Sequence, residues 1–448
     1  MLHELTVISM LVFIIAIFLI FKRPSVKVPY TSKSIHIDYG LASILCASVI
    51  LASSPSSALT LLKEGVLGCD YVKPYSVIVF ILSFSYICLS LDCTGFFEYV
   101  SLRVVKTAGA SGLRLFTYLF LLTSFLSMFT SNDVVILTVT YLVIHICAYA
   151  EVDPVPYLIA QFFAANTLSM GLYIGNPTNI VIADAFGVNF AEFARWMLIP
   201  SISATLVCLL LLLLTFRRRV VKSVKVPDID PRYSLKDRNG AIFGLLTLGC
   251  MLFLISLPTE WINAQAWAIA LLFALVMGLY DLIFNRSRAK MVFRRMPWRI
   301  APFLIGLFII VEGLATSGWT HLFASQISRI VSKNPMVTIS SLSFLSALAA
   351  GLMNNHPMTI FFIKTLKEGG IQRVSEEVRI SLTSALVIGS NLGANYMLTG
   401  SLAGLIWSKI LSDREVKISF SEFSKYGFTI MPLVTLAASL SLTAMFRV

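Results

Sequence analysis

Long apolar runs separated by short polar segments form the pattern of this chain from one end to the other. A helix that spans a membrane needs about 20 mainly apolar residues. By this measure the sequence predicts ten spans, five in each half. They lie near 5–21, 36–54, 75–91, 156–187 and 197–216, and then near 240–257, 264–284, 300–316, 377–408 and 427–446.

Each half also contains a longer apolar block that a polar tip interrupts. The first block covers 115–150 around Ser131-Asn132-Asp133, and the second covers 336–363 around Asn354-Asn355-His356. We predict that each block is a re-entrant hairpin, which enters and leaves the membrane on one face. The expected fold class is therefore an all-α polytopic membrane protein with about 10 spans and 2 hairpins.

The two halves share short motifs as well as their order of elements. Phe190-x-Glu192-Phe193 matches Phe420-x-Glu422-Phe423, and both motifs precede a span. We predict a first repeat at 1–216, a basic cytoplasmic linker at 217–238 and a second repeat at 239–448. Since each repeat has five crossings, an odd number, the second is expected to be inverted relative to the first. Inverted repeats are typical of secondary transporters.

Composition supports a protein that lies almost wholly in the membrane. The 448 residues are 57% hydrophobic and 13% charged, against about 25% charged residues in a soluble domain. No long hydrophilic stretch is available for a soluble domain, and the glycine-rich ATP-binding motif G-x-x-x-x-G-K-[ST] is absent from the sequence. We therefore expect neither an enzyme nor a bound cofactor or metal.

The distribution of charge predicts the orientation. With the N-terminus outside, most of the 35 Lys and Arg fall in the segments 22–33, 92–114, 151–155, 217–238, 285–299 and 409–426, which are then the inside loops. This is the asymmetry of the positive-inside rule. The net charge of +12 therefore needs no nucleic acid. Basic runs such as 217–219 and 294–295 are expected to contact lipid headgroups. We predict a multi-pass inner (plasma) membrane protein with both termini outside.

Four polar clusters interrupt the apolar helices, at matched places in the two halves. Backbone at membrane depth must be buried in protein or line a cavity, and broken helices of this kind form the solute and ion sites of transporters. A cap at a helix kink is the alternative for any single cluster. The predicted substrate- or ion-binding residues are Ser131, Asn132, Asp133, Gly175, Asn176, Pro177, Thr178, Asn179, Asn354, Asn355, His356, Asn391, Gly393 and Asn395.

Asp133 is the sharpest candidate among them. An ionised Asp at the centre of a membrane helix costs roughly 2.5–3.5 kcal/mol on insertion scales, so protonation, a cation or a hydrogen-bond donor must compensate. Proton coupling through Asp133 is one interpretation, and a cap of the returning hairpin helix is the other. The counterpart in the second hairpin is His356, which is either a second proton carrier or a cap. For Glu312, Asp92 and Asp184, a proton relay and a structural partner both stay open.

The chain resembles a known family at several of these motifs. They are Asn132-Asp133, Asn354-Asn355-x-Pro357, and a long run that begins Gly389-x-Asn391-Leu392-Gly393 and continues as Thr399-Gly400-Ser401-Leu402-Ala403-x-Leu405-x-Trp407. These resemble the arsenical pump membrane proteins, which are arsenite and antimonite permeases of the ion transporter superfamily. The resemblance covers roughly 36–446.

The resemblance implies efflux of trivalent arsenic or antimony hydroxides in exchange for protons. From the residues themselves, we expect Asp133 to carry the coupling proton and His356 to be the candidate second carrier. The resemblance also implies a scaffold domain and a transport domain made by the hairpins and broken helices. Members of the wider superfamily are sodium/proton antiporters or sodium-coupled dicarboxylate and organic anion carriers, and that alternative stays open, as does a passive channel. The expected partners are a small inorganic solute, protons or sodium, and the lipid bilayer. Some relatives form homodimers and some work with a separate ATPase subunit, so a homodimer and an ATPase partner both stay open for this chain.

Overall fold

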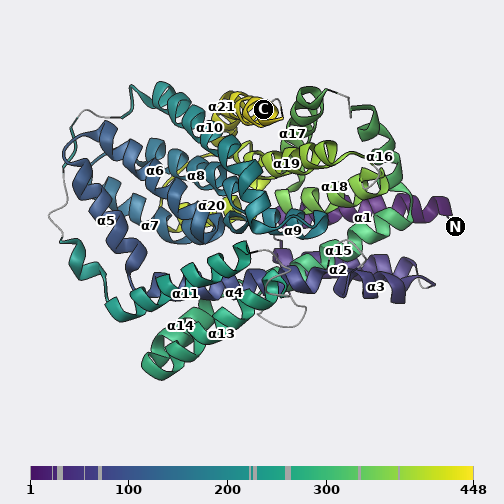
Figure 1. Ribbon diagram of the computed structural model, residues 1–448, viewed down its shortest axis with the longest axis horizontal. Helices are drawn as coiled ribbons and strands as arrows, with labels where there is room; N and C mark the ends of the chain where they lie inside the picture. The colour runs from purple at the N-terminus through teal and green to yellow at the C-terminus, as the bar shows by residue number, and fades with distance from the viewer. Residues whose placement is uncertain are drawn as a thin grey trace.

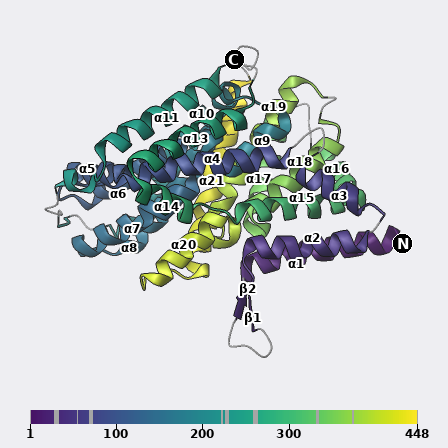
Figure 2. The ribbon, with the colours of Figure 1, turned by 90° about the horizontal axis from the view of Figure 1, so that it is seen from below.

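The structure, a computed structural model, describes residues 2–22, 24–27, 34–54, 56–68, 73–220, 223–225, 230–257, 264–330, 334–371 and 374–446. Helices make up nearly all of this part of the chain (Figure 1). Two strands of three residues, β1 (Ser25–Lys27) and β2 (Ser34–His36), pair antiparallel. They project from the helical body beside α1 and α2 (Figure 2).

The first half of the chain contains ten α-helices in the described residues. They are α1 (Leu2–Lys22), α2 (Tyr39–Ser53), α3 (Ala58–Val66), α4 (Pro74–Cys93), α5 (Phe96–Ala108), α6 (Gly112–Thr130), α7 (Asn132–Ala150), α8 (Pro154–Thr167), α9 (Pro177–Phe186) and α10 (Phe190–Phe216). Between α8 and α9 lie the 3₁₀ turns η1 (Leu168–Gly171) and η2 (Tyr173–Gly175).

The second half follows a further turn, η3 (Pro231–Ser234). Its α-helices are α11 (Arg238–Ser256), α13 (Ala266–Phe284), α14 (Arg286–Arg295), α15 (Ile300–Thr316), α16 (Trp319–Ile330), α17 (Pro335–Met353), α18 (Asn355–Glu368), α19 (Glu376–Leu392), α20 (Leu402–Asp413) and α21 (Phe420–Met445). The turns η5 (Gly393–Asn395) and η6 (Leu398–Gly400) separate α19 from α20. Within the described residues, nine helices are long and apolar enough to cross a membrane, so the predicted polytopic helical class is confirmed.

The order of elements from α4 to α10 recurs from α15 to α21. In each set a long helix is followed by a short one, two helices that meet at a single residue, a broken helix and a final long helix. The turn after the first helix is made by Gly95 (φ 84°) in one set and by Gly318 (φ 82°) in the other, a conformation that glycine adopts without strain. The division at 216 and 239 stays a prediction.

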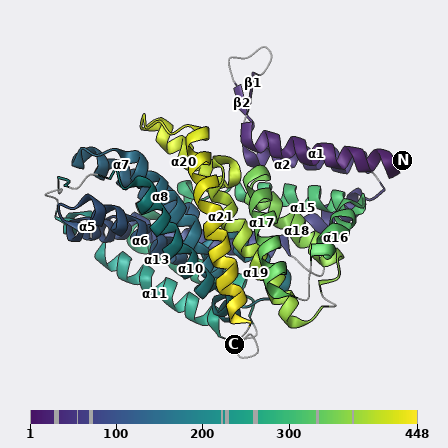
Figure 3. The ribbon, with the colours of Figure 1, turned by 90° about the horizontal axis from the view of Figure 1, so that it is seen from above.

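Helices from the two halves pack against each other. α2 lies along α15, α4 along α13, and α10 along α21. α21 runs through the middle of the molecule, between α6 to α8 on one side and α16 to α18 on the other (Figure 3). We call α1 to α4 and α11 to α15 the scaffold helices, since they pack as one group around α2, α4, α13 and α15.

Several segments that we expected as loops contain helices. The segment 92–114 includes α5, and 285–299 is mostly α14. Both helices bury one face and expose the other, which is the amphipathic pattern of a helix at a surface. Their charges marked them as membrane-flanking, but charge alone does not distinguish a loop from such a helix. In the linker, 221–222 and 226–229 lie outside the described residues, while Lys236 and Asp237 donate backbone hydrogen bonds to Thr94.

Candidate functional site

Both predicted hairpins turn at a single residue with a left-handed backbone. Ser131 joins α6 to α7 with φ 80°, and Asn354 joins α17 to α18 with φ 76°. A residue other than glycine pays about 1–3 kcal/mol for such a conformation, and it persists only where the surroundings hold it. The residues that follow, Asn132 and Asn355, are both buried and begin the returning helix. The two tips therefore have nearly the same backbone.

The two broken helices are also alike in their construction. Asn176 caps α9 through its Oδ1, which accepts from the N–H of Thr178 at 3.1 Å, and Pro177 follows at the first helical position. Ser401 caps α20 in the same way, accepting from the N–H of Gly404 at 3.1 Å. Such caps satisfy backbone groups that the break leaves without helical partners.

Two glycines permit these breaks because the chain passes too close for a side chain. A Cβ on Gly175 would lie 2.2 Å from the carbonyl oxygen of Ser169. A Cβ on Gly393 would lie 2.6 Å from the carbonyl oxygen of Ala347, on the hairpin arm α17. Both glycines were predicted as site residues, and the geometry assigns them the role of close backbone approach.

A chain of three carboxamides connects the first hairpin to both breaks. Asn132 Nδ2 donates to Asn166 Oδ1 at 2.8 Å, and Asn166 Nδ2 donates to Asn395 Oδ1 at 3.0 Å. All three side chains are buried. Buried amides require such partners, since an unpaired one costs about 1–3 kcal/mol.

A second chain of amides lies between the two breaks. Asn176 Nδ2 donates to Asn391 Oδ1 at 2.9 Å, and Asn391 Nδ2 donates to Asn179 Oδ1 at 2.6 Å. Asn179 also donates to the carbonyl of Leu172 at 3.0 Å, and Thr178 donates to Asn176 Oδ1 at 3.0 Å. The polar residues of 175–179 and of 391–395 are thus brought together, as the sequence predicted.

Asn166 is the site residue that the sequence interpretation missed. It lies at the end of α8, as Asn391 lies at the end of α19, and it occupies the centre of the first carboxamide chain. In the second half, Asn391 therefore holds the place of Asn166 rather than that of a residue in 175–179. A lone Asn in the apolar run 162–166 was the available signal, since an amide there needs a partner.

Asp133 faces a small crevice rather than capping its own helix. The crevice has a volume of about 60 Å³ and lies between α7, α9 and α20 on one side and the scaffold helices α4 and α15 on the other. Such a volume holds about four waters. Among the described residues the Asp133 carboxylate has no hydrogen-bond or ion-pair partner, and the cap on its N–H is Asn132 Oδ1 at 2.9 Å. The capping interpretation is therefore wrong for Asp133.

The second tip does not share the amide chains of the first. Asn354 Nδ2 donates to the carbonyl of Thr399 at 3.3 Å, and Asn354 Oδ1 accepts from the N–H of His356. The His356 ring contacts Asn355 Oδ1 through Nδ1 at 3.0 Å, while its buried Nε2 has no partner among the described residues. Asn354, rather than His356, is thus the cap.

The three other acids each have a structural partner. Glu312 on α15 pairs with Lys364 on α18 at 2.8 Å, and Asp92 pairs with Arg295 at 2.8 Å. Asp184 accepts from Ser76 Oγ at 3.4 Å. The pair of Glu312 and Lys364 joins the second hairpin to the scaffold helices.

A larger cavity of about 390 Å³ borders the first turns of α4, whereas the Asp133 crevice borders the later turns of the same helix. It is lined by Lys73, Asp184 and Trp267 among others. Ile180 borders both spaces, and beside it the rings of Phe80 and Tyr173 lie 5.3 Å apart.

Comparisons with known proteins agree on the type of protein. A family model described as a citrate transporter matches residues 4–372. The arsenical pump membrane protein of Escherichia coli is 30% identical over 365 residues, which is 79% of this chain and 83% of that protein. The arsenical pump membrane protein of Yersinia enterocolitica is 27% identical and covers 91% of this chain and 94% of its own length.

Two solved transporter structures share the fold. The YdaH transporter of Alcanivorax borkumensis superposes with a TM-score of 0.60 at 13% identity, covering 100% of this chain and 98% of its own. MtrF of Neisseria gonorrhoeae, described as one of a class of antimetabolite efflux pumps, has a TM-score of 0.57 at 12% identity and covers 99% and 94%.

Proposed function

Since this chain belongs to the arsenical pump membrane protein family, and is thus a secondary transporter of the membrane, we propose that it exports arsenite or antimonite in exchange for protons. The observation that carries the proposal is the neutral, amide-rich interior beside the Asp133 carboxylate, which has no hydrogen-bond or ion-pair partner in the described part of the chain. The relatives named arsenical pump membrane proteins support the substrate.

The substrate fits the chemistry of the site. Arsenite is a neutral trihydroxide near pH 7, so it needs hydrogen-bond donors and acceptors rather than a fixed charge. Asn, Ser and Thr side chains supply both, and these are the residues at the tips and breaks. Among the described residues that line the crevice, the one cation is Arg295, and Asp92 neutralises it at 2.8 Å.

Asp133 would carry the coupling proton. Its carboxylate borders the crevice without a partner among the described residues, and a charge there is costly unless a proton or a solute compensates. Protonation of Asp133 therefore removes the free-energy cost of carrying a charge through the membrane when the loaded or empty site moves. His356, whose Nε2 is buried without a partner in the described chain, is the proposed second carrier.

Alternating access is proposed as the transport cycle. The crevice at Asp133 and the larger cavity both border Ile180 and lie at different levels along α4, and we propose that they open to opposite faces of the membrane. The ion pair of Glu312 and Lys364 would hold the second hairpin against the scaffold in this state and break in the other. We further propose that the chain consists of two inverted repeats and lies in the inner membrane with both termini outside. Whether it forms a homodimer or works with an ATPase partner is open to test.

The experiment is arsenite uptake into everted vesicles driven by an imposed proton gradient. Asp133→Asn should abolish the gradient-driven component, with a loss of about 100-fold or more, while arsenite exchange without a gradient continues. The matched control is Asp413→Asn, which removes an exposed carboxylate that lines neither the crevice nor the larger cavity. Gradient-driven uptake that persists in Asp133→Asn would overturn the coupling role.

A sodium-coupled organic anion carrier is the second candidate. The family model described as a citrate transporter favours it, and so does the presence of Arg295 in the crevice wall. A ligand that binds only the folded state raises apparent stability. Thermal unfolding of the purified chain in arsenite, sodium, citrate and succinate therefore separates the two candidates, since only the true substrate or coupling ion should raise the midpoint.

A further inference from the structure

An open apolar groove of about 1090 Å³ runs between α4 and α13 on the outside of the scaffold helices. Its walls are side chains such as Leu82, Leu275 and Leu282, with Gly278 in the middle of α13. α13 and α14 lie at the edge of the molecule in Figure 1, and α14 forms one end of the groove.

The groove ends at a row of cations on α14. Arg286, Lys290 and Arg294 all line it and are exposed, and residues spaced four apart share one face of a helix. Among the described residues none of the three has a hydrogen-bond or ion-pair partner. Trp298 lies at the same end, with its ring tilted against that of Phe293 at a centroid distance of 4.8 Å, and Trp is enriched at membrane–water interfaces.

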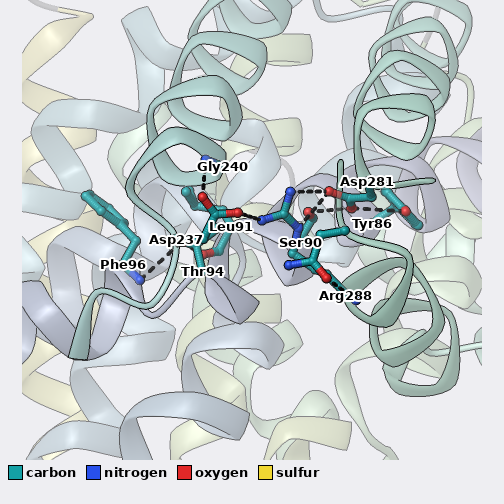
Figure 4. A network of polar contacts seen from close by, with 10 residues as sticks. Tyr86, Ser90, Leu91, Thr94, Phe96, Asp237, Gly240, Asp281 and Arg288 are labelled. Atoms are coloured by element: carbon teal, nitrogen blue, oxygen red, sulfur yellow. Dashed lines mark hydrogen bonds and ion pairs between the residues drawn. The ribbon is translucent and has the colours of Figure 1, made fainter. Parts of the chain in front are cut away.

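The opposite face of α14 is anchored to three scaffold helices (Figure 4). Arg288 Nε donates to Asp281 Oδ1 at 2.7 Å, and Arg288 also pairs with Asp237 on the linker before α11. The same Asp281 accepts from Ser90 at 2.6 Å and from Tyr86 at 3.1 Å, both on α4. The helix is therefore held in place, and the row on its outer face is arranged before any ligand arrives.

We propose that this groove binds an anionic phospholipid. The headgroup phosphate lies against Arg286, Lys290 and Arg294, and an acyl chain follows the groove between α4 and α13. Each basic residue near an anionic membrane surface strengthens binding by about fivefold. A second copy of the chain that docked through the same face would bring two rows of cations together, and like charges facing each other oppose such an interface.

Native mass spectrometry of the full chain in detergent tests the proposal, with phosphatidylglycerol and phosphatidylcholine as the probes. In wild type one phosphatidylglycerol should bind much more tightly than phosphatidylcholine. Arg286→Gln/Lys290→Gln/Arg294→Gln should weaken phosphatidylglycerol roughly 100-fold and leave phosphatidylcholine unchanged. The matched control is Arg217→Gln/Arg218→Gln/Lys417→Gln, which removes three exposed cations away from the groove and should retain the tight site.

A second variant tests the acyl-chain half of the site. A Cβ on Gly278 would meet Tyr86 at an ordinary 3.6 Å, so Gly278→Leu should fold and fill the groove. It should remove the tight site, whereas Gly249→Leu, on an open surface of α11, should not.

Three results would overturn the proposal. They are an equal loss in the control triple variant, an unchanged tight site in Gly278→Leu, or a wild-type dimer that Gly278→Leu dissociates. The last would mean that a second copy covers the groove.

Discussion

The hairpin of α6 and α7 and the hairpin of α17 and α18 turn with the same left-handed backbone, at Ser131 and at Asn354, yet two residues later one carries an acid and the other a base. Asp133 borders the crevice without a partner in the described chain, and His356 is buried against Asn355 and Phe303. The shared backbone shows that the turn is structural. The difference in side chains is where we propose that the chemistry of transport lies.

The two hairpins also differ in how they meet the scaffold helices. Lys364, ten residues after Asn354, pairs with Glu312, which lies six residues before Gly318. Counting the same distances in the first half leads to Tyr141 and Leu89, and Leu89 lines the Asp133 crevice. One hairpin is thus tied to the scaffold by a partly buried ion pair, while the other borders a crevice.

Removing half of that ion pair should have the largest effect. Lys364→Met removes the cation that faces Glu312 and leaves it only the Glu64 carboxyl as a hydrogen-bond partner, in a site where the Lys364 and Glu312 side chains are 18% and 13% exposed. Breaking such a buried pair costs about 3–5 kcal/mol, so we expect a large fall in the thermal unfolding midpoint of the purified protein. Detergent-solubilised samples followed by intrinsic fluorescence report it.

The double variant Glu312→Leu/Lys364→Met serves as its control. It removes both charges together and should recover part of the loss, because an apolar pair of similar volume replaces the ion pair at little cost while Glu64 loses the carboxyl that hydrogen-bonds it. If Lys364→Met alone unfolds like wild type, the second hairpin is not held by this pair and the contrast between the hairpins disappears.

The first hairpin is held instead by the hydrogen bonds of the carboxamide chain from Asn132 through Asn166 to Asn395. Asn166→Leu leaves both Asn132 Nδ2 and Asn395 Oδ1 unpaired. At about 1–3 kcal/mol for each buried polar group, we expect a loss near 3 kcal/mol in unfolding free energy. Asn189→Leu removes an exposed helix cap and should cost only about 1 kcal/mol. Equal losses of unfolding free energy in Asn166→Leu and Asn189→Leu would mean that the amide chain does not hold the first hairpin in place.

Much of the fold was predictable because membrane burial leaves a direct record in the sequence. The long apolar runs and the interrupted blocks predicted the helices of both hairpins and both breaks. The amphipathic helices α5 and α14 were not predicted, since their charges were interpreted only as membrane-flanking. The three-helix anchor of Arg288 and Asp281 was also missed, although a lone Asp281 in an apolar span is costly without a partner and could have been singled out.

The site was predictable in its residues and less so in its pairings. Gly175, Asn176 and Asn391 follow from the logic that a broken helix needs both glycine and amides. Which amide bonds which depends on the packing of α8 against α19 and η5, and no local pattern encodes that. For the same reason the sequence left open whether Asp133 caps its helix, a question that the position of Asn132 decides.

The smallest expected effect on stability comes from replacing the turn residues Ser131 and Asn354 by glycine. Ser131 makes no side-chain hydrogen bond to the described residues, so Ser131→Gly removes only the strain of a Cβ at φ 80°. It should stabilise the protein by about 1 kcal/mol after the added freedom of the unfolded chain is counted. Asn354→Gly relieves the same strain but loses the cap on His356 and the bond to Thr399, each worth about 1 kcal/mol.

The two glycine variants should therefore shift the unfolding midpoint in opposite directions, Ser131→Gly upward and Asn354→Gly downward. Paired melts of the two variants, with wild type alongside, measure the difference directly. A rise in both would mean that the Asn354 side chain contributes nothing beyond its backbone, and a fall in both would mean that Ser131 has a role its geometry does not explain. Opposite shifts would mean that the two hairpins share one backbone turn but use its side chain differently. The Asn354 side chain would then act as a structural cap, and the Ser131 side chain would have no such role and would be free to face the solute.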